Sequence, residues 1–389
     1  FTAKRARSCR PNNSTRVRPS QRSRTLKRPR EAELTARWRN RVTLGVETQA
    51  SQLAARLKQQ ARNLGFGPVG IAALPGSSRI GLRTAALGRW LAAGHQADMA
   101  WMADPRRQAA ESLLPGARSL LAVGLNYYVA AERQPGSLKV ARYGWGRDYH
   151  RVIDGRLRQL GRWLEQQVPD LGWRACVDSA PLLDKAWAEE AGLGWIGKNG
   201  NLIHPRQGSW LLLGHLLTTL ELPPDQPGEP LCGRCTRCIE ACPTGAITEP
   251  FVVDARRCIA FHTIENRDPD LPEAIQAGLG SWVAGCDICQ DVCPWNHQDL
   301  TSSSEPDLQP RDWLLNLQVE QVQGWSEAEW DERLRASALR RIKPWMWRRN
   351  AAAAAPVQAK TPPTAGPQQT PVISPKPEPS PGGWSGMDS

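Results

Sequence analysis

Eight of the ten cysteines in this chain of 389 residues fall into two runs with short, fixed gaps. Such gaps let the chain place several thiolates around one small inorganic group, and C-x-x-C-x-x-C-x-x-x-C-P is the bacterial ferredoxin pattern for [4Fe–4S] clusters. Eight thiolates suffice for two clusters, so the sequence predicts a protein that handles electrons. The runs are Cys232-x-x-Cys235-x-x-Cys238-x-x-x-Cys242-Pro243 and Cys258 followed by Cys286-x-x-Cys289-x-x-x-Cys293-Pro294.

The fourth cysteine of a ferredoxin run ligates the other cluster. Each cluster should therefore be completed by a cysteine from the opposite run, and Pro243 and Pro294 stiffen the backbone after the two exchanged residues. The predicted ligand sets are Cys232, Cys235, Cys238 and Cys293 for one cluster, and Cys258, Cys286, Cys289 and Cys242 for the other.

Zinc is the alternative metal for these cysteines, because paired C-x-x-C spacings also bind Zn²⁺ tetrahedrally. Zinc needs neither the three-cysteine run nor the Cys-Pro endings. Disulfides fit less well, because no signal peptide directs the chain to an oxidising compartment. Cys9 and Cys176 lie outside both runs, and we interpret them as spectators.

The net charge of +12 is concentrated at the N-terminal end. Residues 1–41 contain fourteen Lys and Arg but only two acidic residues, so the remaining chain is formally neutral. Any surface of the folded part that binds nucleic acid must therefore arise from local clustering of basic residues.

Residues 1–45 and 351–389 are predicted to be disordered, the first as a basic leader and the second as an Ala/Pro/Ser/Gly-rich tail. The leader has the composition of a transit peptide, or it reflects where translation was taken to begin, since the chain starts at Phe1. No stretch of about 18 apolar residues predicts a transmembrane helix. We therefore expect a cytoplasmic protein without a membrane partner, and a monomer.

Apolar periodicity predicts alternating helices and strands between these ends, as in α/β or α+β proteins. The fold class we expect is α+β. An N-terminal α/β catalytic domain (46–224) precedes a two-cluster ferredoxin-like domain (225–300) and a short helical segment (301–350). Predicted helices are 51–64, 85–93, 152–168 and 181–191, and predicted strands are 67–74, 119–128, 173–177 and 208–217.

The segment from Cys176 to Ile203 is the richest in chemistry outside the clusters. Asp178 lies where a strand is expected to end and a helix to begin. It is either an N-cap with a lowered pKa or a general acid, which would need a pKa raised by desolvation. Asp184, Glu189 and Glu190 are predicted to face solvent. The glycines of residues 192–199 match no phosphate-binding motif, and a tight turn explains them as well as a flat ligand does.

A second polar and aromatic group precedes the long helix at 152–168. Asp148-x-His150 is similar to the start of the D-x-H-x-x-G cobalamin motif, but Ile153 occupies the glycine position, so His150 is not predicted to ligate cobalt. The members of this group are Arg142, Tyr143, Arg147, Tyr149 and His150.

Six segments between residues 51 and 354 together resemble the epoxyqueuosine reductases, a cobalamin- and iron–sulfur-dependent family that completes queuosine in tRNA. They are ARYGWGRDYH, VDSAPLLDKAWAEEAGLGWIGKNGNLI, CGRCTRCIEACPTGAI, RRCIAFHTIE, GCDICQDVCPWN and ALRRIKPWMWRRNAA.

The resemblance implies cobalamin in the N-terminal half, facing the nearer cluster and reduced by electrons that pass through both clusters. It implies reduction of the epoxide of epoxyqueuosine, at the wobble position of the anticodon, to the alkene of queuosine. The family's proton donor corresponds to Asp178, where a neutral carboxylic acid beside an apolar corrin would serve. Arg142, Thr244 and Asp287 correspond to positions near the cobalamin.

The chain departs from many relatives at Asp184, where they have Glu, and after Ala352, where some continue into tRNA-binding helical repeats. Binding of the tRNA anticodon arm would then depend on the remaining surface, and reduced ferredoxin or flavodoxin is the expected electron donor. The basic candidates for the tRNA surface, which could equally form a solvated face, are Arg340, Arg341, Lys343, Arg348 and Arg349.

Two other functions compete with this interpretation. A reductive dehalogenase-like enzyme would use the same cofactors, but such enzymes carry a twin-Arg leader with an apolar stretch, which the basic leader does not contain. A non-catalytic ferredoxin-type electron-transfer protein would not require the Asp178 segment.

Overall fold

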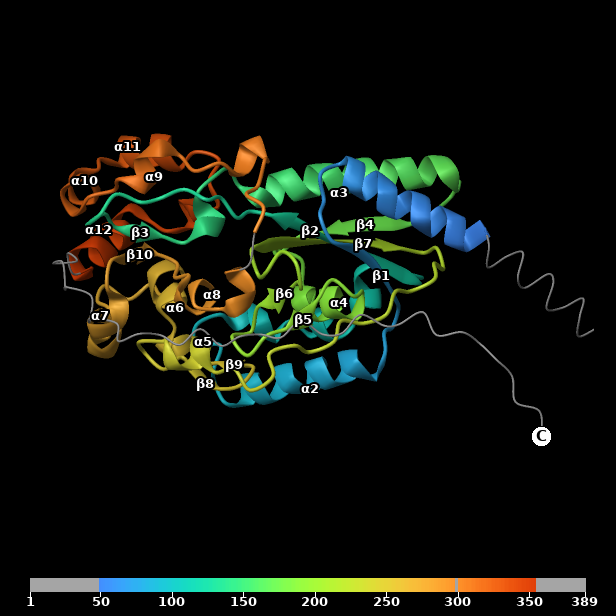
Figure 1. Cartoon of the computed structure of the whole chain (residues 1–389), viewed down its shortest axis with the longest axis horizontal. Coiled ribbons are helices and arrows are strands. Elements are labelled where there is room, and N and C mark those ends of the chain that lie inside the picture. Colours follow the sequence, from blue (N-terminus) through green and yellow to red (C-terminus); the bar gives the residue numbers. More distant parts are fainter. Residues whose placement is uncertain (1–48, 298–299, 355–389) are drawn as a thin grey trace, which may run out of the picture. The chain divides into compact units, whose positions relative to one another are not determined.

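The structure, a computed structural model, describes residues 49–297 and 300–354 (Figure 1). The predicted leader at 1–45 and all but the first residues of the predicted tail lie outside this part of the chain. The described residues from Ser51 onward belong to one compact unit. No helix within the described ranges combines the length and the apolar character needed to cross a bilayer.

A four-stranded antiparallel sheet lies at the centre of the N-terminal part, in the order β1-β2-β7-β4. The two inner strands are continuous apolar runs, as expected for strands that are covered on both faces. Their register runs from Ser119 opposite Thr218 to Asn126 opposite Leu211. The strands are β1 (Val69–Ala73), β2 (Ser119–Asn126), β7 (Leu211–Thr218) and β4 (Trp173–Cys176).

Helices cover both faces of this sheet (Figure 1). On one face, α3 (Tyr149–Gln167) and the helical residues 51–63 bury Leu57, Leu157 and Leu160 against the strands. On the other face lie α2 (Ser78–Ala92) and α4 (Asp184–Glu190), which contribute Ile80 and Trp187 to a second core. These layers confirm the predicted α+β fold class.

Two predicted helix boundaries were wrong. The α2 helix begins at Ser78, where Ser77 accepts a hydrogen bond from the Arg79 backbone, so it is longer than the predicted 85–93. The α4 helix begins at Asp184 rather than at Pro181, because residues 177–183, which follow β4, form turns and not a helix.

The cysteine-rich part consists of short elements connected by loops. One of its strands, β10 (Trp282–Ala284), pairs in parallel with β3 (Lys139–Val140) from the N-terminal part, so the two parts share backbone hydrogen bonds. The remaining elements between Leu193 and Cys293 are β5 (Trp195–Ile196), β6 (Leu202–Ile203), α5 (Arg237–Glu240), β8 (Ile247–Glu249), β9 (Val252–Val253), the short 3-10 helix η5 (Ala255–Arg257), α6 (Ile259–Ile264), α7 (Glu273–Leu279) and α8 (Ile288–Asp291).

The C-terminal segment is helical, as predicted, but its last helix continues to Ala353 rather than ending at residue 350. It packs onto β3, β10 and α6 through a core rich in tryptophan, in which Trp145, Trp282 and Trp347 are buried. Its helices are α9 (Asp312–Leu315), α10 (Val319–Gly324), α11 (Glu327–Leu334) and α12 (Pro344–Ala353).

Candidate functional site

The structure sorts the eight cysteines of the two runs into two cavities. Three cysteines of the first run and one of the second line the smaller cavity, beside Trp295 and Lys198. Its cysteines are Cys232, Cys235, Cys238 and Cys293. The backbone N–H of Cys235 donates to the carbonyl of Cys232, which curls the C-x-x-C turn around this space.

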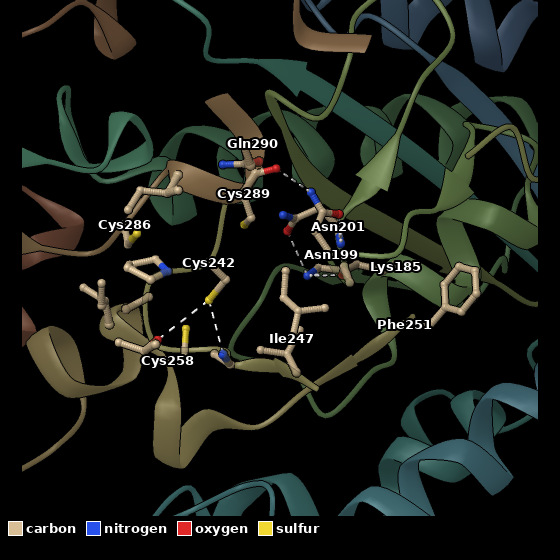
Figure 2. A pocket seen from close by; sticks show the side chains of 18 of the residues that line it. Lys185, Asn199, Asn201, Cys242, Ile247, Phe251, Cys258, Cys286, Cys289 and Gln290 are labelled. Atoms are coloured by element: carbon tan, nitrogen blue, oxygen red, sulfur yellow. Dashed lines mark hydrogen bonds between the residues drawn. The ribbon is translucent and has the colours of Figure 1, made fainter. Parts of the chain in front are cut away.

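The other four cysteines line a larger cavity of about 410 Å³. Figure 2 shows their side chains on one side of this space and Lys185 and Phe251 on the other. These cysteines are Cys242, Cys258, Cys286 and Cys289. Asn199 borders both cavities, and its side-chain amide donates to the Cys289 carbonyl at 3.1 Å. The grouping of the cysteines is the crossed one that the sequence predicts.

Burial raises the pKa of several of these thiols. The pKa of Cys293 rises to about 11, and those of Cys258 and Cys289 are also raised, in each case mainly by desolvation. Thiols in such surroundings release their protons when a metal binds, since the thiolate is the ligand.

N–H groups of the described residues are directed at cysteine sulfurs, for example at those of Cys232 and Cys242. The Trp195 indole Nε1 lies 3.4 Å from Cys232 Sγ, and the Ala246 backbone N lies 3.2 Å from Cys242 Sγ. Hydrogen bonds to ligand sulfurs are one means by which a protein adjusts the potential of an iron–sulfur cluster.

A third cavity, of about 510 Å³, holds Asp178. Lys185, Gly200 and Phe251 line both this cavity and the 410 Å³ cysteine cavity, so the two spaces adjoin. Apolar side chains form much of its wall, among them Leu182, Trp101 and Leu211–Leu213. A carboxylate in an apolar space next to a cysteine-lined cavity can combine proton transfer with electron transfer.

Asp178 lies in the turn that follows β4. Its φ of +31° is unusual for a residue with a side chain, and such strained backbone is often found at functional sites. Its side chain is 55% exposed. Asp178 Oδ2 lies 3.0 Å from Nε2 of His150, whose Nδ1 lies 2.7 Å from Asp148 Oδ1.

The hydrogen bond from His150 lowers the pKa of Asp178, and the nearby charges of Arg341 and Arg107 contribute to the same shift. Burial opposes protonation of His150, but its hydrogen bonds to Asp148 and Asp178 outweigh burial and raise its pKa to about 9. At neutral pH the proton therefore resides on His150.

Both interpretations of Asp178 drawn from the sequence need correction. The raised pKa expected for a neutral acid is wrong, because an imidazole lies beside the carboxylate. The N-cap alternative is also wrong, because the residue before α4 is Leu183. Sequence reasoning missed His150 as the partner of Asp178. The D-x-H pattern marked His150, but the contact joins α3 to the β4 turn.

The predicted exposure of the acidic residues on α4 was wrong for Glu189 and Glu190, which are 1% and 6% exposed. Glu189 forms a bidentate ion pair with Arg83 at 2.7–2.9 Å and accepts from the Ile196 backbone. Glu190 accepts two hydrogen bonds from Ser77. Asp184 lies 3.3 Å from His215 on β7.

The three residues predicted to lie near the cobalamin do not line the same cavity in the structure. Thr244 lines the 410 Å³ cavity, with its Oγ1 3.7 Å from Cys242 Sγ. Arg142 and Asp287 line none of the three cavities. They form a partly buried ion pair, with Arg142 Nη1 3.3 Å from Asp287 Oδ2. The Arg142 backbone N–H also donates to Asp287 at 2.9 Å, and the Arg142 guanidinium contacts Asp291 at 2.6 Å.

Lys185 is a site residue that sequence reasoning did not identify. Its Nζ donates to the Gly200 carbonyl at 2.8 Å and to Asn201 Oδ1 at 3.3 Å, where the two adjoining cavities meet. Desolvation lowers the pKa of Lys185. No motif marked it, because its importance comes from the contact between α4 and the loop before β6.

Most of the basic residues proposed to bind tRNA have partners within the protein. Arg340 pairs with Asp331, and Arg341 pairs with Glu265 at 2.8 Å. The guanidinium of Arg349 donates to backbone carbonyls, among them that of His262, and Arg348 donates to the Trp325 carbonyl. Arg340, Arg341 and Lys343 are exposed, whereas Arg348 and Arg349 are only partly so.

Family models and known proteins match this chain over long stretches. A family model described as "Epoxyqueuosine reductase QueG, DUF1730" matches residues 107–179, and one described as "4Fe-4S double cluster binding domain" matches residues 231–296. The chain is 70% identical over 311 residues to the epoxyqueuosine reductase of Synechococcus sp. strain CC9605, which covers 80% of this chain and 97% of the relative. The corresponding protein of Synechococcus sp. strain RCC307 is 69% identical over 302 residues, or 78% of this chain and 93% of the relative.

Solved structures of the same kind are also similar. An epoxyqueuosine reductase crystallised with an epoxyqueuosine-modified tRNA-Tyr stem loop superposes with a TM-score of 0.72 and 29% identity, over 78% of this chain and 80% of that chain. A Bacillus subtilis epoxyqueuosine reductase, in which a catalytic loop named for an aspartate is swung out of the active site, gives a TM-score of 0.72 at 28% identity, over 78% and 81% of the two chains.

Proposed function

Because this chain belongs to the epoxyqueuosine reductase family, and is therefore an oxidoreductase, we propose that it reduces epoxyqueuosine to queuosine at the wobble position of tRNA. The observation that carries this proposal is the adjacency of the Asp178 cavity and the cavity of Cys242, Cys258, Cys286 and Cys289. Epoxide reduction needs both electrons and protons at one place, and these two spaces would supply them.

Two [4Fe–4S] clusters would occupy the cysteine-lined cavities. Support comes from the match to a double-cluster domain and from the sorting of the cysteines into two sets of four. The first set is Cys232, Cys235, Cys238 and Cys293, and the second is Cys242, Cys258, Cys286 and Cys289. The proposed domains remain those predicted from the sequence, with the clusters within residues 225–300.

Cobalamin is the cofactor proposed for the space between the second cluster and Asp178. The residues present fit a large, flat ligand, because the 510 Å³ cavity of Asp178 adjoins the cluster cavity at Lys185, Gly200 and Phe251 and has a mainly apolar wall with a few polar groups. Thr244, Lys185 and Phe251 would contact it. When bound, it would supply a strongly reducing metal centre for opening the epoxide. Arg142 and Asp287 stay predicted neighbours, and their ion pair would fix the backbone between Cys286 and Cys289.

Asp178 would deliver a proton to the oxygen that leaves the epoxide. Its side chain is open to the cavity and hydrogen-bonded to a group that carries a proton. The aspartate-bearing catalytic loop of the Bacillus subtilis relative lends support to a loop-borne carboxylate in this role.

The proposed substrate is the modified anticodon arm, since a related enzyme has been crystallised with such a stem loop. The exposed residues Arg340, Arg341 and Lys343 are candidates for phosphate contacts. Reduced ferredoxin or flavodoxin is the proposed electron donor. The monomeric state and cytoplasmic location stay predictions from the sequence.

The test is anaerobic reconstitution with iron, sulfide and cobalamin, followed by incubation with reductant and tRNA from cells blocked at epoxyqueuosine. The tRNA is then digested to nucleosides, and their masses are measured by mass spectrometry. Loss of one oxygen from epoxyqueuosine is the expected result. If no oxygen is lost although both clusters and cobalamin are present in the protein, the proposed substrate is wrong. Another reducible substrate, such as a halogenated small molecule, would then take its place.

A further inference from the structure

We propose that Asp148, His150 and Asp178 form a proton relay in which His150 stores the proton and loads Asp178 for each protonation of the leaving oxygen. The inference rests on the proposed function and extends it to a residue that does not itself touch the substrate. His150 is thus a positioning and supplying residue, whereas Asp178 is the group at the substrate.

The relay is held in place by the start of α3. Asp148 is the N-cap of this helix and accepts from the His150 backbone N–H at 3.1 Å, while its Oδ1 also contacts His150 Nδ1 at 2.7 Å. The Tyr149 ring stacks on the imidazole with centroids 4.1 Å apart. These contacts leave Nε2 as the ring nitrogen that reaches Asp178, at 3.0 Å.

The charges around His150 favour the protonated form of its imidazole. Asp148 and Asp178 are the two carboxylates that contact the ring, and together they raise the pKa of His150 to about 9 despite burial. Arg107 and Arg341 act on Asp178 and favour its ionised form. Other titratable groups coupled to this site include Tyr143, Tyr149 and Asp184, and burial raises the pKa of both tyrosines. Two cations are coupled as well, Lys185 to Asp178 and Arg151 to Asp148.

The stoichiometry of the reaction shows why a store is needed. Converting an epoxide to an alkene breaks two C–O bonds, forms one C=C bond and releases the oxygen as water, which consumes two electrons and two protons. The enzyme's reductant supplies the electrons. Asp178 is ionised at neutral pH, because its pKa is lowered, so it can only pass on protons that it receives.

Each passage through the relay balances. The proton on His150 Nε2 moves to Asp178 Oδ2, and Asp178 then protonates the oxygen as a C–O bond breaks. Neutral His150 keeps its Nδ1 proton, held by Asp148. Its side chain is 31% exposed, so Nε2 can take the next proton from solvent. Two passages deliver the two protons of one turnover.

A purely structural role for His150, which would anchor the Asp178 turn to α3, is the competing explanation. The substitution His150→Gln separates the two, because the Gln amide can still donate to Asp178 but cannot be protonated. Asp148→Asn is the matched variant, since Asn is an equally good N-cap but does not stabilise the imidazolium.

The relay predicts a change in pH dependence. In the wild-type holoenzyme, single-turnover conversion of the modified stem loop should decline as the pH rises through about 9, where His150 loses its proton. With His150→Gln the rate at pH 8 should fall on the order of 100-fold, as for loss of a general acid, and the loss should shrink as the pH is lowered. The KM for the stem loop should stay within about twofold, since substrate contacts are unchanged. A loss of the same size at every pH would overturn the relay.

Protonation of His150 can also be measured without turnover. In ¹⁵N-histidine-labelled holoenzyme, one imidazole should titrate near pH 9; its signal should be absent in His150→Gln and should titrate at lower pH in Asp148→Asn. An imidazole that titrates near its ordinary value of about 6.5 would contradict the proposal. Failure of the wild-type enzyme to convert the stem loop would count against the proposed function, and the NMR titration would still decide whether His150 stores a proton.

Discussion

Asp178 shows how a single side chain acquires its properties from residues that are distant in the sequence. Its carboxylate is open to an apolar cavity, which alone would raise its pKa. Instead its pKa is lowered, because His150 lies 3.0 Å away with a raised pKa of its own. The carboxylate and the imidazolium therefore act as a pair.

Removal of the Asp178 carboxylate should abolish proton delivery without affecting cofactor binding. We expect Asp178→Asn to retain iron, sulfide and cobalamin but to lose on the order of 100- to 10,000-fold in turnover, as for other general acids. Metal analysis, absorbance spectra and single-turnover assays check this. Asp154→Asn, on a partly exposed part of α3, serves as the control. Retained activity of Asp178→Asn would exclude its role as proton donor.

A cysteine of the first run should matter for the cluster formed mainly by the second run. Cys242 lines the cavity of Cys258, Cys286 and Cys289, so Cys242→Ser should damage that cluster and leave the other intact. Iron content and EPR spectra of the reduced protein report which cluster is lost. Cys176→Ala, in the buried core of the sheet, should retain both. Loss of the cluster at Cys232 instead would refute the crossed ligation.

At the scale of elements, the burial of the α4 side chains depends on the two surfaces between which the helix packs. It lies between the sheet and α2, so the two glutamates near its end, Glu189 and Glu190, are buried and need partners. Glu189 satisfies this need through Arg83 of α2 and the backbone of Ile196. The charge pattern of α4 alone suggested a solvated face, because the sequence does not reveal a second helix that covers it.

The ion pair between α2 and α4 should contribute strongly to stability. Arg83→Ala leaves the Glu189 carboxylate, which is 1% exposed, buried without its charged partner, and breaking a buried pair costs about 3–5 kcal/mol. Chemical denaturation followed by circular dichroism measures the loss. Arg89→Ala, on the exposed face of the same helix, should change stability by less than about 0.5 kcal/mol. Similar effects of both substitutions would argue against this account.

At the scale of the whole described unit, residues from three parts of the chain form one core. Leu138 and Trp145 come from the N-terminal part, Ile259 and Trp282 from the cysteine-rich part, and Trp347 from the last helix. The parallel pairing of β3 with β10 links the same parts through their backbones. The cysteine-lined cavities therefore depend on the packing of the C-terminal segment.

This shared core predicts that clusters and fold are lost together. Trp347 is 0% exposed, so Trp347→Ala should cost about 3–5 kcal/mol, and cluster absorbance should disappear at the same lowered temperature as helical circular dichroism. Trp345 on the same helix is 38% exposed, so Trp345→Ala should have a much smaller effect. Loss of helix signal in Trp347→Ala with intact cluster absorbance would show that the parts unfold independently.

The sequence by itself determined the iron–sulfur domain of this protein, its fold class and its family, and it predicted the crossed ligand sets, because those properties depend on local spacing and on periodicity. Ligand gaps such as C-x-x-C act over a few residues, and the apolar runs of β2 and β7 already require buried strands. The tertiary structure alone decided which groups meet across long separations. His150 beside Asp178, Arg83 beside Glu189 and Lys185 between two cavities all join different elements. Their charges and burial follow from packing, which no local pattern encodes.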